Sequence, residues 1–256
     1  MHHYLTTILT HKRREVEKMK RENPLPLHLQ EKREKRSLKL ALTEKKMGII
    51  AEFKRSSPSE GEIDHQRSLE EMIAAYEAGG AAALSILTDT TFFKGDLSFL
   101  ERAKKSSQLP VLMKDFILDP YQLHLANQQG ADAVLLIAAA LSPQECQELI
   151  REAHALNLEV LLEIHEEKEL PYIAYKPDLV GINNRDLTTF KVDLSNAIQL
   201  INKLPTSIPA VAESGIHSTY ELETLKKAGF RNFLIGSSLM KSNDPSLLLQ
   251  EMLRLC

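Results

Sequence analysis

One unit recurs eight times from Gly48 onward, and this recurrence limits the fold more than any other feature of the chain. In each unit a short, mostly apolar run precedes a loop and then a stretch with helical spacing of apolar residues. Runs of this kind, without clean alternation, are typical of parallel strands covered on both faces. The eight predicted strands are Gly48–Phe53, Ala82–Leu87, Pro110–Lys114, Ala133–Ala138, Glu159–Glu163, Leu179–Asn183, Ala210–Glu213 and Asn232–Gly236.

Stretches with helical periodicity separate these runs. The predicted helices are His65–Ala78, Leu97–Ser106, Pro120–Gln129, Pro143–Leu156, Lys168–Tyr175, Leu194–Leu204, Thr219–Ala228 and Pro245–Leu253. Eight strands that alternate with helices predict a closed (β/α)₈ TIM barrel, with an open doubly wound sheet as the alternative. The G-x-G-x-x-G fingerprint that usually follows the first strand of such an open sheet is missing.

Residues 1–45 do not fit the repeat. They contain two mixed-charge helical stretches, His11–Arg21 and Glu31–Lys39, which Pro24 and Pro26 separate. We expect residues 1–45 to form a helical extension packed on the barrel, where it could roof one end. Residues 46–256 are expected to form the barrel as a single catalytic domain.

Composition narrows the class of protein. The net charge of −3 argues against a protein whose main task is to neutralise nucleic-acid phosphates. The longest apolar run, Ala131–Leu141, is interrupted by Asp132 and is too short to span a bilayer. Cys146 and Cys256 form neither a disulfide framework nor a metal-binding spacing. We therefore expect a cytoplasmic protein that works as a monomer, without a metal, a nucleic acid or a membrane as partner.

Charged and amide side chains stand at or just after the ends of the predicted strands. Barrel enzymes place their reactive groups at the carboxyl ends of the strands. Glu52 and Lys54 are two residues apart, so both should leave the same face of the first strand. One such charge could be a structural ion pair, as Glu52–Lys54 or Glu163–Lys114 could be, but charges at several ends predict an active site. The residues are Glu52, Lys54, Lys114, Glu163, Asn183, Arg185, Glu213 and Ser214.

Two turns predict a phosphate site. Ser214-Gly215 and Gly236-Ser237 follow the seventh and eighth strands, whose loops commonly bind phosphate in barrels. Glycine lets backbone N–H groups approach the phosphate oxygens, and Ser57 could add a hydroxyl.

Seven segments, taken in order, resemble the indole-3-glycerol-phosphate synthase family, and the resemblance runs from about Leu5 to the end. They are Ile50–Ser59, Leu87–Asp89 with Phe92–Gly95, Lys114–Phe116, Leu162–His165, Gly181–Leu187, Ala212–Ile216 and Leu234–Met240. The resemblance implies a (β/α)₈ barrel with an N-terminal helical extension. It also implies a lyase of tryptophan biosynthesis that acts on 1-(o-carboxyphenylamino)-1-deoxyribulose 5-phosphate. The expected products are indole-3-glycerol phosphate, CO₂ and water, with no metal or organic cofactor.

The resemblance also implies roles for residues. Lys114 is similar to the general acid of ring closure, with Glu163 as its carboxylate partner; Glu52 and Lys54 would serve the later dehydration and hold substrate anions. Asn183, Arg185, Glu213 and Ser214 would orient the substrate and stabilise charge. The implied phosphate cradle is Ser57, Gly215, Gly236 and Ser237, and the implied lining of the anthranilate pocket is Phe93, Phe116 and Leu136. Two loop residues depart from the pattern, namely Glu60 and Asp96.

The acid role raises the question of the lysine pKa, which is about 10.4 when unperturbed. A dry barrel mouth, or Lys54 as a second lysine nearby, would lower the pKa of Lys114 and ease proton transfer. His165, two residues after Glu163, could share its face, but a structural histidine is the expected role.

Two alternatives remain open at this point. The chain could be another phosphate-binding barrel, such as an isomerase or a Schiff-base lyase with Lys54 or Lys114 as nucleophile. The cysteine–aspartate pair expected of the related phosphoribosylanthranilate isomerases is not evident at the strand ends. The chain could also be a barrel that binds a ligand without catalysis.

Overall fold

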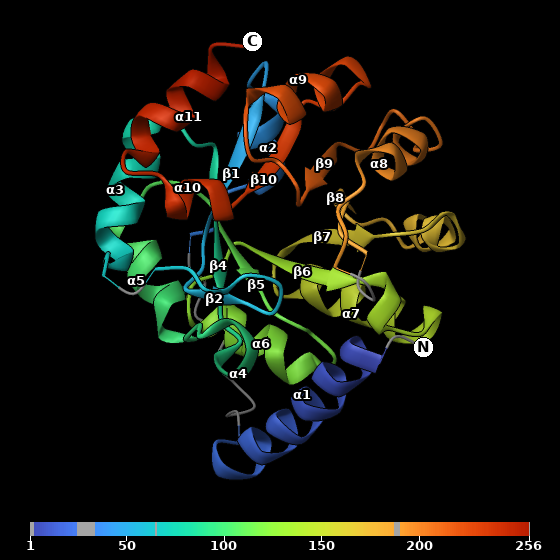
Figure 1. Cartoon of the computed structure of the whole chain (residues 1–256). Helices are drawn as coiled ribbons and strands as arrows, with labels where there is room; N and C mark the ends of the chain where they lie inside the picture. The colour runs from blue at the N-terminus through green and yellow to red at the C-terminus, as the bar shows by residue number, and fades with distance from the viewer. Residues whose placement is uncertain (1–2, 25–33, 65, 187–189, 256) are drawn as a thin grey trace.

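The computed structural model describes residues 3–24, 34–64, 66–186 and 190–255, and its centre is a closed barrel of parallel strands (Figure 1). Around the barrel the strands follow the order β1-β10-β9-β8-β7-β6-β5-β4. Their bounds are β1 Gly48–Phe53, β4 Ala83–Leu87, β5 Val111–Lys114, β6 Ala133–Ile137, β7 Glu159–Ile164, β8 Leu179–Asn183, β9 Ala210–Glu213 and β10 Asn232–Ile235. The predicted closed barrel is confirmed, and the open-sheet alternative is wrong.

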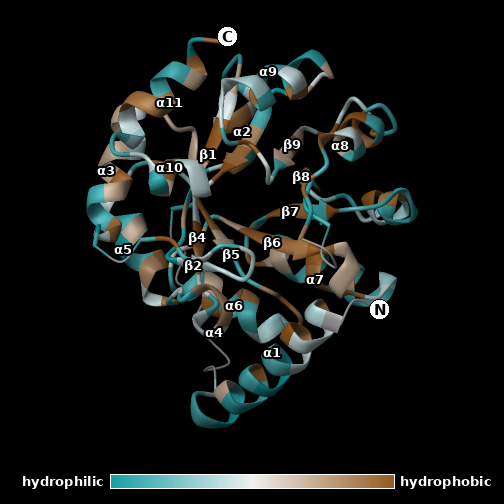
Figure 2. Ribbon diagram, viewed as in Figure 1, coloured by the Kyte–Doolittle hydropathy of each residue, from teal (hydrophilic) through white to brown (hydrophobic). Residues whose placement is uncertain are grey.

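An outer ring of helices covers the barrel, and the apolar strands lie at its centre (Figure 2). The ring is α3 Leu69–Gly79, α5 Ser98–Ser106, α6 Pro120–Gln128, α7 Pro143–Ala155, η2 Glu167–Tyr175, α8 Leu194–Ile201, α9 Thr219–Lys227 and α11 Pro245–Leu253. Capping boxes begin α3, α7 and α9, and proline is the first residue of α6, α7 and α11. The η2 segment is a 3₁₀ helix with Pro171 inside it.

Several short elements follow the carboxyl ends of strands, and none of them was predicted. They are the hairpin β2 Ser56–Ser57 with β3 Gly61–Glu62, and the turns α4 Thr90–Phe93, η1 Ala138–Ala140 and α10 Ser237–Lys241. Segments of two to five residues are too short to show a hydrophobic period, so the sequence cannot reveal them. Together they surround the mouth formed by the carboxyl ends.

The N-terminal segment reaches both ends of the barrel. Helix α1, His3–Glu22, runs beside α6, and Lys20 Nζ lies 2.7 Å from Asp119 Oδ2. The segment 34–43 crosses the amino ends of the strands, where Ser37 Oγ donates to Glu159 Oε1 at 2.5 Å. Helix α2, Leu38–Thr43, buries Leu38 and Leu42 against that end.

The predicted helix Glu31–Lys39 is wrong at residues 34–37 and correct at Leu38 and Lys39, which begin α2. Residues 34–37 are not helical, because the Ser37 side chain caps the N-terminus of α2 and so starts the helix at Leu38. The remaining residues of that stretch lie outside the described part of the chain. The same holds for Pro26, for His65 at the start of a predicted helix, for Leu187 of one motif and for Cys256. Among the described residues, no helix is long and apolar enough to cross a membrane.

Candidate active site

A pocket opens at the carboxyl ends of the strands, and it is lined by every residue that was predicted to be catalytic. Glu52 lies in β1 and Lys54 directly after it, while Lys114 ends β5 and Asn183 ends β8. Glu163 is the penultimate residue of β7, and Glu213 ends β9. The barrel therefore brings together side chains that are far apart in the sequence, because all eight strands run in the same direction.

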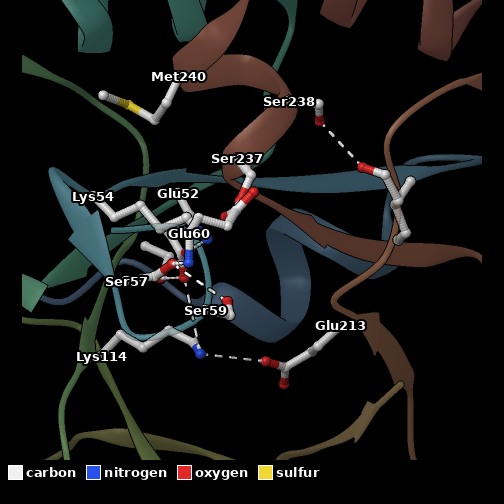
Figure 3. Close-up of polar contacts among 12 residues, drawn as sticks. Glu52, Lys54, Ser57, Ser59, Glu60, Lys114, Glu213, Ser237, Ser238 and Met240 are labelled. Atoms are coloured by element: carbon white, nitrogen blue, oxygen red, sulfur yellow. Dashed lines mark hydrogen bonds and ion pairs between the residues drawn. The ribbon is translucent and has the colours of Figure 1, made fainter. Parts of the chain in front are cut away.

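Lys114 is the centre of this group. Its Nζ lies 3.6 Å from Glu213 Oε2 and 3.8 Å from both Glu52 Oε2 and Glu163 Oε2 (Figure 3 draws Glu52 and Glu213). Burial would lower the pKa of Lys114, but the three carboxylates outweigh it and raise that pKa above its ordinary value. The expectation that the site lowers the Lys114 pKa is therefore wrong, since the surrounding charges are mainly negative. Lys54 Nζ lies 3.3 Å from Glu52 Oε1.

Glu163 is held by side chains on two neighbouring elements. Asn183 Nδ2 donates to Glu163 Oε1 at 3.0 Å, and His165 Nε2 lies 3.1 Å from the same oxygen. Burial raises the pKa of Glu163, but the Lys114 charge and the His165 contact prevail and hold it at about 2. Glu163 is therefore ionised at neutral pH. Burial alone would lower the pKa of His165, but the contact with Glu163 raises it.

Glu213 differs from Glu163 although the two carboxylates face the same lysine. It is 1% exposed, and neither carboxylate oxygen has a hydrogen-bond partner among the described residues. Burial and the charge of Glu163 raise the pKa of Glu213 to about 8, against the opposite pull of Lys114. A Cβ on Gly181 would overlap Glu213 Oε1, so glycine at this point of β8 makes room for the carboxyl group. The two glutamates that face Lys114 thus have pKa shifts of opposite direction, raised for Glu213 and lowered for Glu163.

The stability of the fold should depend on pH through Glu213. The carboxyl group keeps its proton up to about pH 8 in the folded chain and releases it near pH 4.5 in the unfolded chain. The free energy of unfolding therefore falls as the pH rises through this window. Glu213→Gln removes the titration. The difference in melting temperature, variant minus wild type, should therefore increase between pH 5 and pH 8.

Circular dichroism melts at both pH values test this expectation. Glu223→Gln is the matched control, since Glu223 is a half-exposed residue of α9 that lies 4.0 Å from Lys227. A difference between Glu213→Gln and the wild type that stays constant with pH would mean that Glu213 has an ordinary pKa in the folded chain.

Glu52 is anchored from outside the pocket. Ser85 Oγ donates to Glu52 Oε2 at 3.5 Å, and the Tyr76 hydroxyl donates to the Glu52 backbone carbonyl at 3.0 Å. A Cβ on Gly236 would come within 2.5 Å of Glu52 Oε1, so this glycine leaves space for the carboxylate. The sequence analysis assigned Gly236 to phosphate binding alone and did not foresee this second reason for glycine.

The predicted phosphate-binding residues gather on one side of the pocket. Ser57, Gly215, Gly236 and Ser237 all line it, as does Ser214. Ser214 and Gly215 both have positive φ, at 64° and 74°, which turns the chain sharply after β9. One neighbour was not foreseen, because the Ser237 hydroxyl donates a hydrogen bond to Glu60 (Figure 3).

Aromatic and apolar side chains form the opposite wall. The rings of Phe93 and Phe116 lie 6.2 Å apart between centroids, as expected for a lining of an aromatic pocket. Leu136 is a correction, because its neighbours Leu135 and Ile137 line the pocket and Leu136 does not. Side chains alternate along a strand, so this choice of face was wrong by one residue.

Helix α1 also contributes side chains to this wall, and these residues were not predicted as site residues from the sequence. Tyr4, Leu5 and Ile8 line the pocket together with Phe190. Their spacing on one helical face was the available signal. The Tyr4 and Phe190 rings lie 5.0 Å apart, so the N-terminal helix and the loop after β8 meet over the mouth.

Arg185 lines the pocket after β8 and is fixed by its own loop. Its backbone N–H donates to Asn183 Oδ1 at 2.9 Å, and its Nη1 donates to the Phe190 carbonyl at 3.1 Å. The contact to Asn183 turns that amide so that its Nδ2 faces Glu163. Within the described residues there is no cluster of histidine, cysteine and carboxylate side chains that could hold a metal ion.

Comparisons with known proteins agree with this site. The family model described as Indole-3-glycerol phosphate synthase matches residues 5–252. The chain is 48% identical over 253 residues to the indole-3-glycerol phosphate synthase of Bacteroides thetaiotaomicron, covering 98% of this chain and 97% of that one. It is 48% identical over 208 residues to that of Desulfosudis oleivorans, covering 80% and 79%.

A solved structure shows the same fold at low sequence identity. The 3-hexulose-6-phosphate synthase of Salmonella typhimurium superposes with a TM-score of 0.65 and 14% identity, covering 82% of this chain and 98% of that one. The family match spans the barrel, the site residues and most of α1. The chain belongs to the indole-3-glycerol phosphate synthase family.

Proposed function

We propose that this chain converts 1-(o-carboxyphenylamino)-1-deoxyribulose 5-phosphate into indole-3-glycerol phosphate, CO₂ and water. The observation that carries the proposal is the Lys114 ammonium group, set among three glutamates between an aromatic wall and a serine–glycine cradle. The substrate has the matching order of parts, with an aromatic ring at one end, a ketone in the middle and a phosphate at the other end. Family membership supports the same reaction.

Ring closure requires an acid at the ketone oxygen. The ring carbon that bears the carboxylate attacks the ketone carbon, and the oxygen takes up negative charge as the bond forms. The raised pKa keeps Lys114 protonated at neutral pH, so its ammonium group is always available at that point. An alkoxide is a strong base, so even a weak acid can protonate it as the charge develops.

Loss of CO₂ then returns the electrons of the carboxylate bond to the ring and restores its aromaticity. In the last step the new hydroxyl group leaves as water, and the neighbouring ring CH₂ group loses a proton. This step needs an acid at oxygen and a base at carbon. In our proposal Glu163, ionised beside Lys114, is the carboxylate partner in acid–base work, and Glu52 with Lys54 serves the dehydration.

The remaining residues bind and orient. Asn183 holds Glu163, and Arg185 together with Ser214 faces the substrate from the loops after β8 and β9. Burial raises the pKa of Glu213 and so favours its neutral form, which can donate a hydrogen bond and does not repel the substrate carboxylate. Ser57, Gly215, Gly236 and Ser237 form the phosphate cradle, and Phe93 with Phe116 contacts the anthranilate ring.

The test is the growth of indole fluorescence when the purified chain is mixed with the substrate. The chain contains no Trp, so the protein background is low. We expect enzyme-dependent emission that grows with time. A folded chain that gives no signal would contradict the proposal, and trapping of a covalent adduct by borohydride would favour the Schiff-base alternative.

The proposal extends to the organisation of the chain. We assign residues 1–45 to an extension that completes the substrate wall through Tyr4, Leu5 and Ile8, and residues 46–256 to the catalytic barrel. We also propose that the chain works in the cytoplasm as a monomer. The exposed large apolar side chains in the described part are Leu40 of α2, Val192 of the loop after β8, Tyr220 of α9 and Leu247 of α11. Sedimentation velocity would give the mass in solution.

A further inference from the structure

The hairpin after β1 lays a carboxylate on the phosphate cradle. Its two short strands pair Ser56 with Glu62 and Ser57 with Gly61, and Glu60 stands in the turn between them. The Glu60 carboxylate accepts a hydrogen bond from the Ser237 hydroxyl through one oxygen and from Lys241 Nζ at 2.8 Å through the other (Figure 3 draws Glu60 and Ser237). An anion of the protein itself thus binds a hydroxyl of the cradle.

Other contacts hold the turn in this position. The Glu60 backbone N–H donates to Ser57 Oγ at 3.2 Å, so a second cradle hydroxyl is also used by the turn. The side chain of Glu60 is only 17% exposed. Burial raises its pKa, but the hydrogen bonds from Lys241 and Ser237 and the charge of Lys54 outweigh this and lower it to about 2. Glu60 therefore carries a full negative charge at neutral pH.

We propose that Glu60 is a resident competitor of the substrate phosphate, which must displace the Glu60 carboxylate from Ser237 and Lys241 before it can bind the cradle. The inference rests on the proposed function and deepens it, because it names a residue that sets affinity for the phosphate end. A phosphate group carries between one and two negative charges near neutral pH. Two anions cannot share one hydroxyl donor and one ammonium group without strong repulsion.

Displacement requires only a local movement. The hairpin has two residues in each strand, and Gly61 has a φ of +67° with open space around it. Once Glu60 leaves, the Ser237 hydroxyl and the Lys241 ammonium group are both free to donate to phosphate oxygens. In the free chain the Glu60 carboxylate thus neutralises the cradle. The substrate phosphate can use these donors only once the contacts of Glu60 with Ser237 and Lys241 are broken, and breaking them costs free energy.

The variant Glu60→Gln isolates the charge. Glutamine has nearly the same size; its Oε1 can still accept a hydrogen bond from Lys241 Nζ and its Nε2 can donate one to the Ser237 hydroxyl, so the hairpin should keep its place, but the competing charge is gone. We expect inorganic phosphate to bind the variant about 5- to 30-fold more tightly, which corresponds to the 1–2 kcal/mol of a charged against a neutral hydrogen bond. The KM for the substrate should fall in the same direction, with kcat within about twofold of the wild type.

Glu62→Gln is the matched control, because Glu62 is an exposed residue of the same hairpin and makes the same change of net charge. Calorimetric titration with inorganic phosphate, at fixed ionic strength, is the primary measurement and needs no turnover. Tighter binding in Glu60→Gln but not in Glu62→Gln is the expected result. Unchanged or weaker phosphate binding in Glu60→Gln would overturn the inference and make Glu60 a structural clamp of the hairpin.

The role of Glu60 and the proposed reaction can be contradicted separately. Turnover by the wild type with equal phosphate affinity in wild type and Glu60→Gln would remove the role of Glu60 and leave the proposed function standing. Tighter phosphate binding in a chain without turnover would keep Glu60 as a competitor at an anion site and remove the proposed reaction.

Discussion

Lys114→Met is expected to lower kcat by about 10²- to 10⁴-fold, the usual contribution of a positioned general acid. The reason is geometric and electrostatic. The Lys114 ammonium group lies at the centre of the three glutamates at the barrel mouth and is the cation that can reach a ketone oxygen between them. Methionine has a similar length and fills the same space, but it can neither donate a proton nor stabilise an alkoxide.

The fold should survive this substitution. Of the three carboxyl groups left behind, Glu213 has a pKa raised by burial, which favours its neutral form, and Glu163 keeps hydrogen-bonding partners in Asn183 and His165. Loss of the lysine should raise the pKa of Glu163, so part of the repulsion is relieved by proton uptake. Far-UV circular dichroism and a melting curve, compared with steady-state fluorescence kinetics, separate a catalytic defect from a folding defect.

Two further variants sharpen the test. Lys114→Arg keeps the positive charge, but a guanidinium group does not give up its proton in proteins. A large loss of kcat in both variants supports proton transfer, whereas recovery in Lys114→Arg would reduce the role of Lys114 to electrostatic stabilisation. Lys105→Met, at an exposed position of α5, is the control. Turnover near the wild-type level in a folded Lys114→Met variant would remove Lys114 from the mechanism.

The barrel itself was readable from the sequence because each buried strand leaves a local mark. A run such as Gly48–Phe53 is apolar except for Glu52 near its end, and its bounds in the structure are those predicted. Charged residues at strand ends were equally visible, since Lys114 and Glu213 interrupt apolar runs and each proves to be the last residue of its strand. Because the strands are parallel, their carboxyl ends, and the charged residues there, meet in one pocket.

Properties that depend on distant neighbours were not readable. The direction of the Lys114 pKa shift follows from which side chains face it across the barrel, and the expected second lysine proved less important than three glutamates. The face of Leu136 depends on strand register, where one residue decides between pocket and helix layer. Glu60 stood out only as a departure from a family pattern, and its contact with Lys241 spans most of the chain.

Lys12→Met is expected to destabilise the docking of α1 by about 3–5 kcal/mol, the cost of removing one partner from a buried ion pair. Lys12 is 2% exposed, although nothing in the sequence distinguished it from the other charges of the extension. Its Nζ lies 2.7 Å from Asp89 Oδ2, 2.9 Å from Asp115 Oδ1 and 3.0 Å from Glu15 Oε2. The substitution would leave Asp89 and Asp115 buried beside a thioether.

The loss should appear first as local opening. The contacts of Lys12 connect α1 to two loops at the barrel mouth, so α1 can detach while the closed barrel remains intact. Hydrogen exchange should accelerate in α1 before it accelerates in the strands, and limited proteolysis should cut within or just after α1. Lys18→Met is the matched control on the same helix, where the lysine is 66% exposed and lies 3.8 Å from Glu22.

The kinetic consequence separates Lys12 from a residue that matters only for stability. Asp115 directly follows Lys114, and Asp89 caps α4, which carries Phe93. Tyr4, Leu5 and Ile8 reach the pocket only while α1 is docked. The Lys12→Met variant should therefore show a raised KM at temperatures where the barrel is fully folded, together with faster exchange in α1. If KM and α1 exchange both match those of Lys18→Met, then α1 is held by its apolar contacts, and the buried ion pairs of Lys12 contribute little to the site.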